Sequence, residues 1–162
     1  MFIENSAGEG TKLGRDLDQL AYVINGVDEK YRSQVGICID TMHIFGSGQY
    51  HFGRIEDVVK FFEDFDEKIG LEKLEVIHLN DSDPAVQFGA KRDKHACLCK
   101  GNIWGSNEKE DLAIEEKIAS LKYLIDKTSH LGVPLIGETP DDFWDFNVVN
   151  ELCGIVKYPC NC

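Results

Sequence analysis

Histidine and aspartate recur in one polar stretch of the chain, HLNDSDPAVQFGAKRDKH, which runs from His78 to His95. The stretch follows an apolar run and shows no hydrophobic period of its own, so we expect a long loop after a buried strand. It ends in an Asp-x-His step formed by Asp93 and His95. Imidazole nitrogens and carboxylate oxygens suit zinc or manganese, so the sequence makes this loop a candidate metal-binding segment.

Residues of the same chemistry end all four predicted strands, with one further histidine three residues after the second: Glu4, Asp40 with His43, His78 and Glu138. Sites in parallel α/β folds are built at the C-terminal edge of the sheet. A single acidic residue after a strand is most often a helix cap, but here every predicted strand shares the placement. Because clustered carboxylates repel one another without a cation between them, we expect a divalent metal at this edge.

The elements that position these residues alternate along the chain. Predicted strands cover residues 1–5, 34–40, 71–80 and 133–139, and predicted helices cover residues 14–27, 54–70, 110–132 and 141–157. This alternation predicts an α/β fold with a parallel sheet covered by helices. Four such units match half of an eight-unit barrel or a small open sheet. The first strand is short for a buried strand, so the chain reads as the later half of a longer domain.

The composition limits the classes of partner. The 162 residues carry a formal net charge of −12, which argues against a basic nucleic-acid-binding face. Two features weaken this argument: a bound metal neutralises its carboxylate ligands, and a local basic patch contains Lys91, Arg92, Lys94 and Lys100. No apolar run is long enough to span a bilayer, so we expect no membrane partner.

The six cysteines have no C-x-x-C spacing of the zinc-ribbon kind. Because the N-terminal residues lack the features of a secretory signal, we expect reduced thiols in the cytoplasm or nucleus. Cys38 lies in an apolar run and is predicted to pack in the core. The terminal pair Cys160 and Cys162 is predicted to lie in a frayed tail.

Five segments, taken in order, resemble the signature segments of the endonuclease IV family of abasic-site DNA-repair enzymes: ENSAGEG, GICIDTMHIFGSG, IHLNDS, KRDKHACLCKGNIW and PLIGET. The resemblance covers nearly the whole chain. It implies a (β/α)8 TIM-barrel type fold of which residues 1–162 form only the C-terminal four βα units. It also implies a nuclease that cuts the phosphodiester 5′ to an abasic site in double-stranded DNA with three zinc ions. The Ile103-Trp104 step resembles divergent members from large DNA viruses.

The resemblance also implies roles for single residues. Seven residues would bind zinc: Glu4, Asp40, His43, His78, Asp93, His95 and Glu138. Glu4 would bridge two zincs, and Glu138 would orient or deprotonate the attacking water, so these two are the expected catalytic residues. Asn80 and Asp81 would hold ligand imidazoles in the right tautomer. Lys91, Arg92 and Lys94 would contact DNA phosphates.

The chain departs from the family because the earlier strands, which supply two histidine ligands of the first zinc, are not in the sequence. We therefore expect about two bound zincs, a missing N-terminal half of the barrel as partner, and no activity of these residues alone. A xylose-isomerase-like sugar isomerase or epimerase with one or two divalent metals is the alternative enzyme, and it has no need of His43, Asp93 or His95. A non-catalytic zinc-binding remnant is the third interpretation.

Overall fold

The computed structural model describes residues 1–106 and 112–154. Among them, a four-stranded parallel sheet has the order β1-β2-β3-β6, with β1 at Phe2–Glu4, β2 at Gly36–Asp40, β3 at Leu74–His78 and β6 at Leu135–Ile136. The parallel register places Asp40 opposite His78 and Glu4 opposite Cys38. The predicted α/β class and strand–helix alternation are confirmed, and the sheet edges at β1 and β6 have no further strand among the described residues.

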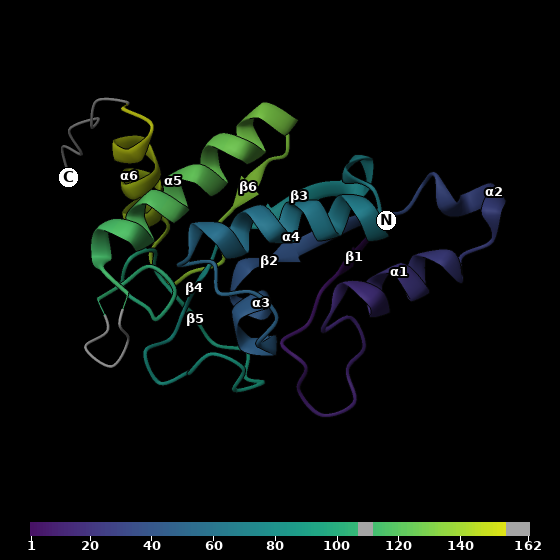
Figure 1. Ribbon diagram of the computed structural model, residues 1–162, viewed down its shortest axis with the longest axis horizontal. Coiled ribbons are helices and arrows are strands. Elements are labelled where there is room, and N and C mark those ends of the chain that lie inside the picture. Colours follow the sequence, from purple (N-terminus) through teal and green to yellow (C-terminus); the bar gives the residue numbers. More distant parts are fainter. Residues whose placement is uncertain (107–111, 155–162) are drawn as a thin grey trace.

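The described residues form six helices. They are α1 (Leu17–Asn25), α2 (Glu29–Arg32), α3 (Thr41–Ser47), α4 (Ile55–Lys68), α5 (Ile114–Leu131) and α6 (Asp142–Leu152), with a 3-10 turn η1 at Leu71–Lys73. Figure 1 shows α4 and α5 side by side in front of the strands. The predicted helices at 14–27 and 54–70 are confirmed as α1 and α4. Parts of the predicted helices at 110–132 and 141–157 lie outside the described residues.

Helix α4 illustrates how the sequence pattern produces the core. Val58, Phe61, Phe62 and Phe65 are all buried. Val58 lies three and four residues before the adjacent pair Phe61 and Phe62, and Phe65 lies four and three residues after them, which is the spacing of one helical face. The helix begins with Glu56 and Asp57 in its first turn and ends at Lys68, an arrangement that matches the helix dipole. Its buried face, together with Ile37 and Ile39 of β2, forms part of the main hydrophobic core.

The long segment after β3 folds back on itself rather than remaining irregular. A short antiparallel pair joins β4 (Asp81–Ser82) to β5 (His95–Ala96), with Ser82 opposite His95. The segment between them rests on α3, where the amide of Gly89 donates to the carbonyl of Phe45 and the amide of Lys91 donates to that of Gly46. The end of the loop therefore returns to the strand end from which it started.

No helix within the described ranges combines the length and the apolar character needed to cross a bilayer.

Candidate metal centre

The first group of predicted ligands lies where β1, β2, β3 and β6 end. One ligand atom from each of Glu4, Asp40, His78 and Glu138 lies within 4.8 Å of the others. Nδ1 of His78 is 2.9 Å from Oε2 of Glu138, 3.3 Å from Oε1 of Glu4 and 4.0 Å from Oδ2 of Asp40. The parallel strands end at the same edge of the sheet, and this brings the four side chains together.

A second group adjoins the first and shares Asp40 with it. Asp40, His43 and His95 offer ligand atoms within 4.8 Å of one another. Asp93 lies beside both imidazoles, with Oδ2 at 3.2 Å from Nε2 of His43 and Oδ1 at 3.4 Å from Nε2 of His95. The β4–β5 pairing is what delivers Asp93 and His95 to this position. All seven predicted ligands thus lie in one continuous cluster.

Hydrogen bonds to main-chain carbonyls orient two of the imidazoles. Nδ1 of His43 lies 2.9 Å from the carbonyl oxygen of Asn5, and Nδ1 of His95 lies 3.0 Å from that of Glu138. A carbonyl oxygen can only accept, so each Nδ1 carries the proton. In both rings this leaves Nε2 directed toward Asp93 and Asp40, the arrangement typical of metal-binding histidines.

The electrostatics of the cluster favour a cation. Three imidazole nitrogens, Nε2 of His43, Nδ1 of His78 and Nε2 of His95, are buried and make no hydrogen bond among the described residues. Such groups are costly to leave unsatisfied. Burial by itself would lower the pKa of His43. The nearby negative charges of Asp40, Asp93 and Glu4 outweigh this effect, so the pKa of His43 is raised overall. The donor set of imidazole nitrogens and carboxylate oxygens therefore fits zinc or a similar divalent ion.

Asn80 is buried and contacts the candidate ligands in a different way from the one predicted. Its side-chain Nδ2 donates to Oδ2 of Asp40 at 2.6 Å, and its Oδ1 accepts from the amide of Glu138 at 2.8 Å. It therefore positions a carboxylate and a strand end, and its side-chain hydrogen bonds within the described residues go to these groups rather than to a ligand imidazole.

Asp81 has a third set of contacts, and its side-chain hydrogen bonds within the described residues go to main-chain amides rather than to a ligand imidazole. Its carboxylate is fully buried and accepts hydrogen bonds from the amides of Ser82, Gly101, Ile103 and Trp104. Burial raises its pKa to about 6, against the opposing effect of these four amides. Asp81 therefore organises the turn at residues 101–104 beneath the loop that carries Asp93 and His95.

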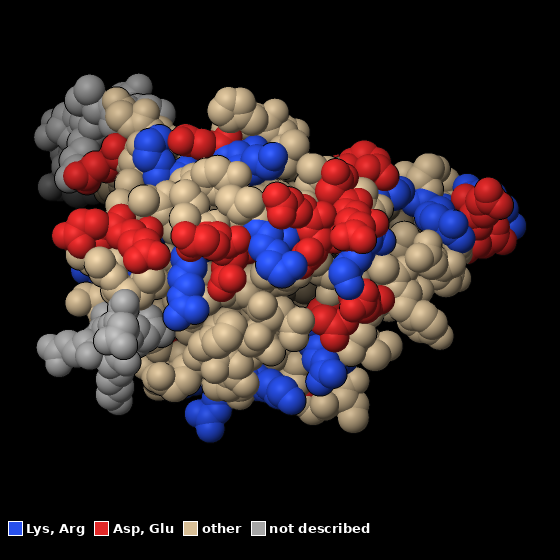
Figure 2. Space-filling view, in the orientation of Figure 1, with Lys and Arg blue, Asp and Glu red and all other residues tan. Residues whose placement is uncertain are grey.

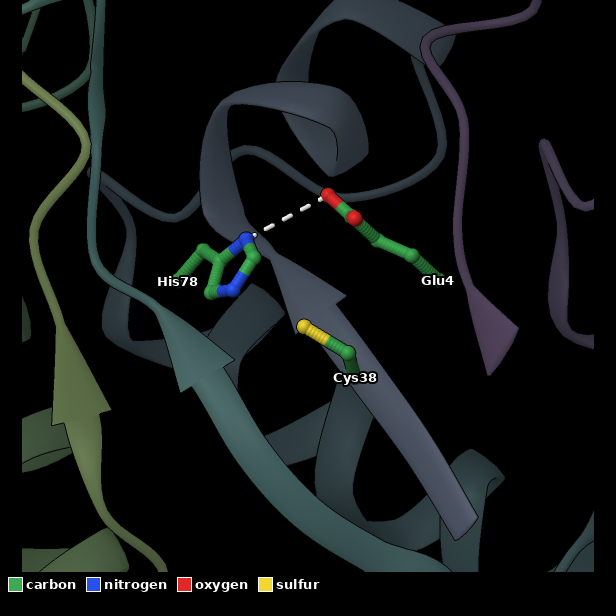
Figure 3. Close-up of side chains that lie close together, drawn as sticks. All are labelled: Glu4, Cys38 and His78. Atoms are coloured by element: carbon green, nitrogen blue, oxygen red, sulfur yellow. Dashed lines mark ion pairs between the residues drawn. The ribbon is translucent and has the colours of Figure 1, made fainter. Parts of the chain in front are cut away.

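Cys38 lies below the candidate ligands on the inner face of the sheet. Figure 3 shows its thiol beneath the space between Glu4 and His78, and one atom from each of the three residues lies within 4.8 Å of the others. The predicted burial is confirmed at 4% exposure, and burial, with the charges of Glu4 and Asp40, raises the thiol pKa to about 12. A groove of about 400 Å³ opens here, lined also by Phe2, Val76 and Ile136.

The three predicted DNA contacts, Lys91, Arg92 and Lys94, are all exposed on the loop that returns toward the site. Figure 2 shows basic side chains along the lower edge of the molecule, where this loop lies in Figure 1. Lys91 adopts a φ of 55°, a left-handed conformation uncommon for a residue with a side chain. These positions place positive charge beside an otherwise acidic site.

Two polar residues at the strand ends were missed from the sequence. Asn5 is 3% exposed and bonds to Asp40 and His43. Thr41 is fully buried, and its hydroxyl donates to the carbonyl of Asn80 at 2.7 Å and accepts from the amide of Asn80 at 2.9 Å. Their only signal in the sequence is that each directly follows a predicted ligand, Glu4 or Asp40.

Comparisons with known proteins agree with this geometry. The family model of xylose isomerase-like TIM barrels matches residues 1–106. A protein named probable endonuclease 4 from Chlorobium phaeovibrioides is 37% identical over 139 residues, which are 86% of this chain and 43% of that protein. A protein of the same name from Chlorobium limicola is 39% identical over 144 residues, which are 88% of this chain and 43% of that protein.

A solved structure has the same fold. Endonuclease IV from Thermus thermophilus superimposes with a TM-score of 0.70 at 26% identity, covering 96% of this chain and 50% of that one. The chain therefore spans about half the length of the proteins it matches. These findings confirm the predicted resemblance to the endonuclease IV family and the predicted TIM-barrel type. The chain belongs to the xylose isomerase-like TIM barrel family, and within that family it is similar to endonuclease IV.

Proposed function

We propose that residues 1–162 form the C-terminal half of an endonuclease IV-like barrel that hydrolyses DNA 5′ to an abasic site, and that they act with an N-terminal half supplied in the same or another chain. The observation that carries this proposal is the second ligand group. His43, Asp93 and His95 converge beside Asp40 through the β4–β5 pairing. A sugar isomerase has no need of these three residues. The names of the relatives support the same activity.

The seven ligands would hold about two zincs within this chain. One would lie among Glu4, Asp40, His78 and Glu138, and the other among His43, Asp93, His95 and Asp40. Bound zinc would lower the pKa of water toward ~7 and offset charge on the attacking and leaving oxygens. A third zinc would need ligands from the N-terminal half, with Glu4 at the exposed β1 edge as the shared residue.

The chain's own residues have separate tasks in this reaction. Glu138 is exposed at the end of β6 and lies beside His78, so it can orient the attacking water and accept its proton. The carboxylate of Asp40 accepts hydrogen bonds from the side chain of Asn80 and from the amide of His43. Because Asp40 belongs to both ligand groups, these bonds fix the position of one group relative to the other. Lys91, Arg92 and Lys94 would bind phosphates on either side of the abasic nucleotide.

The test uses a chimera in which the N-terminal half of the Chlorobium limicola relative precedes this chain. We expect the chimera to nick an abasic duplex on the 5′ side and leave an intact one uncut. His95→Ala should lower nicking by at least about 100-fold, because it removes a proposed zinc ligand, and even residues that only orient such ligands are typically worth up to about that factor. His130→Ala is the matched control, since that exposed imidazole lies on α5, away from the cluster.

Zinc content and nicking activity together test the ligand assignment. Elemental analysis of the chain after gel filtration should give about two zincs, and His43→Ala and His95→Ala should each lose one. A folded, zinc-loaded chimera that leaves abasic DNA intact would favour the non-catalytic remnant. Equal nicking by the chimera and its His95→Ala variant would contradict the role given to the second group.

A further inference from the structure

Asn5 occupies a special place in the sheet. It follows the last residue of β1, and its amide donates to the carbonyl of Cys38 at 3.3 Å, one step beyond the final β1–β2 register pair. The residue is 3% exposed although it is polar and lies beside the exposed Glu4. Buried amides in proteins are almost always hydrogen-bonded, so the partners of this side chain reveal what it holds.

Both ends of the Asn5 side chain bind the main chain of one candidate ligand. Oδ1 accepts from the amide of Asp40 at 2.6 Å, and Nδ2 donates to the carbonyl of Asp40 at 3.1 Å. The side-chain amide therefore continues the parallel ladder where the strand backbone leaves the sheet. Aspartate has no donor for the carbonyl of Asp40, and glutamine is one methylene longer, so asparagine is the side chain that satisfies both bonds.

The main chain of Asn5 holds a second candidate ligand. Its carbonyl oxygen accepts from Nδ1 of His43 at 2.9 Å, which directs Nε2 of His43 toward Asp93. Nε2 of His43 and Oδ2 of Asp93 are ligand atoms of the types that bind zinc, and they lie side by side. One buried residue thus fixes the main chain of Asp40 and the ring of His43, which both belong to the second ligand group.

We propose that Asn5 is a positioning residue of the metal centre: it sets the tautomer and orientation of His43 and the placement of Asp40 before metal binds. The inference rests on the proposed function in that it takes these residues to be metal ligands. A residue that only stabilised the sheet would change the free energy of unfolding and leave the His43 ring unchanged. Asn80 is the corresponding residue on the other side of Asp40, and it contacts no imidazole in the described hydrogen bonds.

The experiment compares Asn5→Ala and Asn5→Asp with Asn25→Ala, a control on the exposed end of α1. The full chain is labelled with ¹⁵N-histidine, and long-range proton–nitrogen spectra of the metal-free protein report which ring nitrogen of His43 carries the proton. Zinc affinity is measured by competition with a chromophoric chelator. The spectra are recorded at alkaline pH, where the His43 ring is neutral although its pKa is raised. We expect one Nδ1-protonated tautomer in the wild type and in Asn25→Ala. We expect a mixture in both Asn5 variants, because loss of side-chain bonds to Asp40 lets the carbonyl of residue 5 move away from Nδ1 of His43.

Zinc affinity should fall about tenfold or more in the Asn5 variants, the effect typical of residues that orient metal ligands. If Asn5→Ala does not fold, Asn5→Asp decides, because it keeps the acceptor for the Asp40 amide. Wild-type ring signals and zinc affinity in the folded Asn5 variants would overturn the inference. A wild type without zinc affinity would instead overturn the proposed function, and the ring signals of the metal-free protein would still decide the role of Asn5.

Discussion

The thiol of Cys38 shows how one buried residue is influenced by charges that serve another purpose. It faces the inner side of the sheet, at a position opposite Glu4 in the β1–β2 register. The carboxylates of the candidate metal centre at the strand ends also disfavour a thiolate one layer below. Cys38 is therefore a neutral packing residue next to strongly charged groups, and its chemistry should differ from that of an exposed cysteine.

We expect Cys38 to resist alkylation by iodoacetamide at pH 8, because its pKa of about 12 keeps the thiolate scarce and the side chain is 4% exposed. Cys153, which is exposed, is the internal control. Mass spectrometry of the tryptic peptides after timed labelling gives both rates from one sample. Labelling of Cys38 as fast as Cys153 in folded protein would contradict the burial and charge described here.

At the scale of elements, the short helix α3 connects the site to its loop. Gly46 is buried in α3, and a Cβ atom added there would lie 2.9 Å from the carbonyl oxygen of Arg92 and 3.0 Å from the Cβ of Ala7. The loop residue Arg92 directly precedes Asp93. The absence of a side chain at this position therefore lets the loop approach closely enough to place Asp93 over His43.

Gly46→Ala tests this close approach. Alanine is the better helix former by about 1 kcal/mol, so the helix itself should persist in circular dichroism. The added methyl group should displace the loop and lower the zinc affinity of the second ligand group by several-fold, measured with the same chelator competition. An increase in thermal stability with unchanged zinc affinity would show that the loop does not depend on this contact.

The turn at residues 101–104 depends on Asp81 in a similar way. Asp81→Ala removes the acceptor of four buried amides, and we expect a loss of about 3 kcal/mol in the free energy of unfolding, since each unsatisfied group costs roughly 1–3 kcal/mol before the turn relaxes. Urea denaturation gives the value. Asp126→Ala, at an exposed pair with Lys122, should change it by less than about 0.5 kcal/mol.

The effect of Asp81→Ala should also depend on pH. The carboxyl has a folded-state pKa of about 6, above the ordinary aspartate value of 3.8, so the folded state binds the proton more tightly than the unfolded state between these values. Its contribution to stability is then largest below about pH 4 and falls as pH rises toward 6. The loss caused by Asp81→Ala should accordingly be larger at pH 5 than at pH 7, and the opposite trend would contradict the raised pKa.

These elements also show what sequence reasoning can and cannot supply. Strand ends carrying Glu4, Asp40, His78 and Glu138 were predictable because a parallel sheet brings like ends together. The contacts of Asn5, Asn80 and Asp81 were not, because they depend on where backbone amides and carbonyls lie after folding. Helix α3 was missed because all its residues, Thr41 to Ser47, are buried, so it has no polar face and no period to detect.

At the scale of the whole molecule, apolar surface gathers where a further strand or helix would pack. Phe2 on the β1 edge is 59% exposed and Ile136 on the β6 edge is 48% exposed, and both line the groove on the inner face. Phe143 and Phe146 on α6, next to the β6 edge, are 73% and 58% exposed. Open edges and apolar patches of this kind favour association, and in the relatives the other half of the length is available to cover them.

We therefore expect these 162 residues, expressed alone, to associate rather than to form an active monomer. Sedimentation velocity at micromolar concentration should show dimers or larger species. Phe2→Lys and Ile136→Lys together should shift the distribution toward monomer, because two charges at the edges oppose strand pairing. Tyr22→Lys on α1 is the matched control, since Tyr22 is 77% exposed but lies on the outer helical layer.

Addition of the N-terminal half of a relative should convert the associated species into a one-to-one complex that cuts abasic DNA. A monodisperse monomer that cuts abasic DNA unaided would show instead that four βα units already build a complete site.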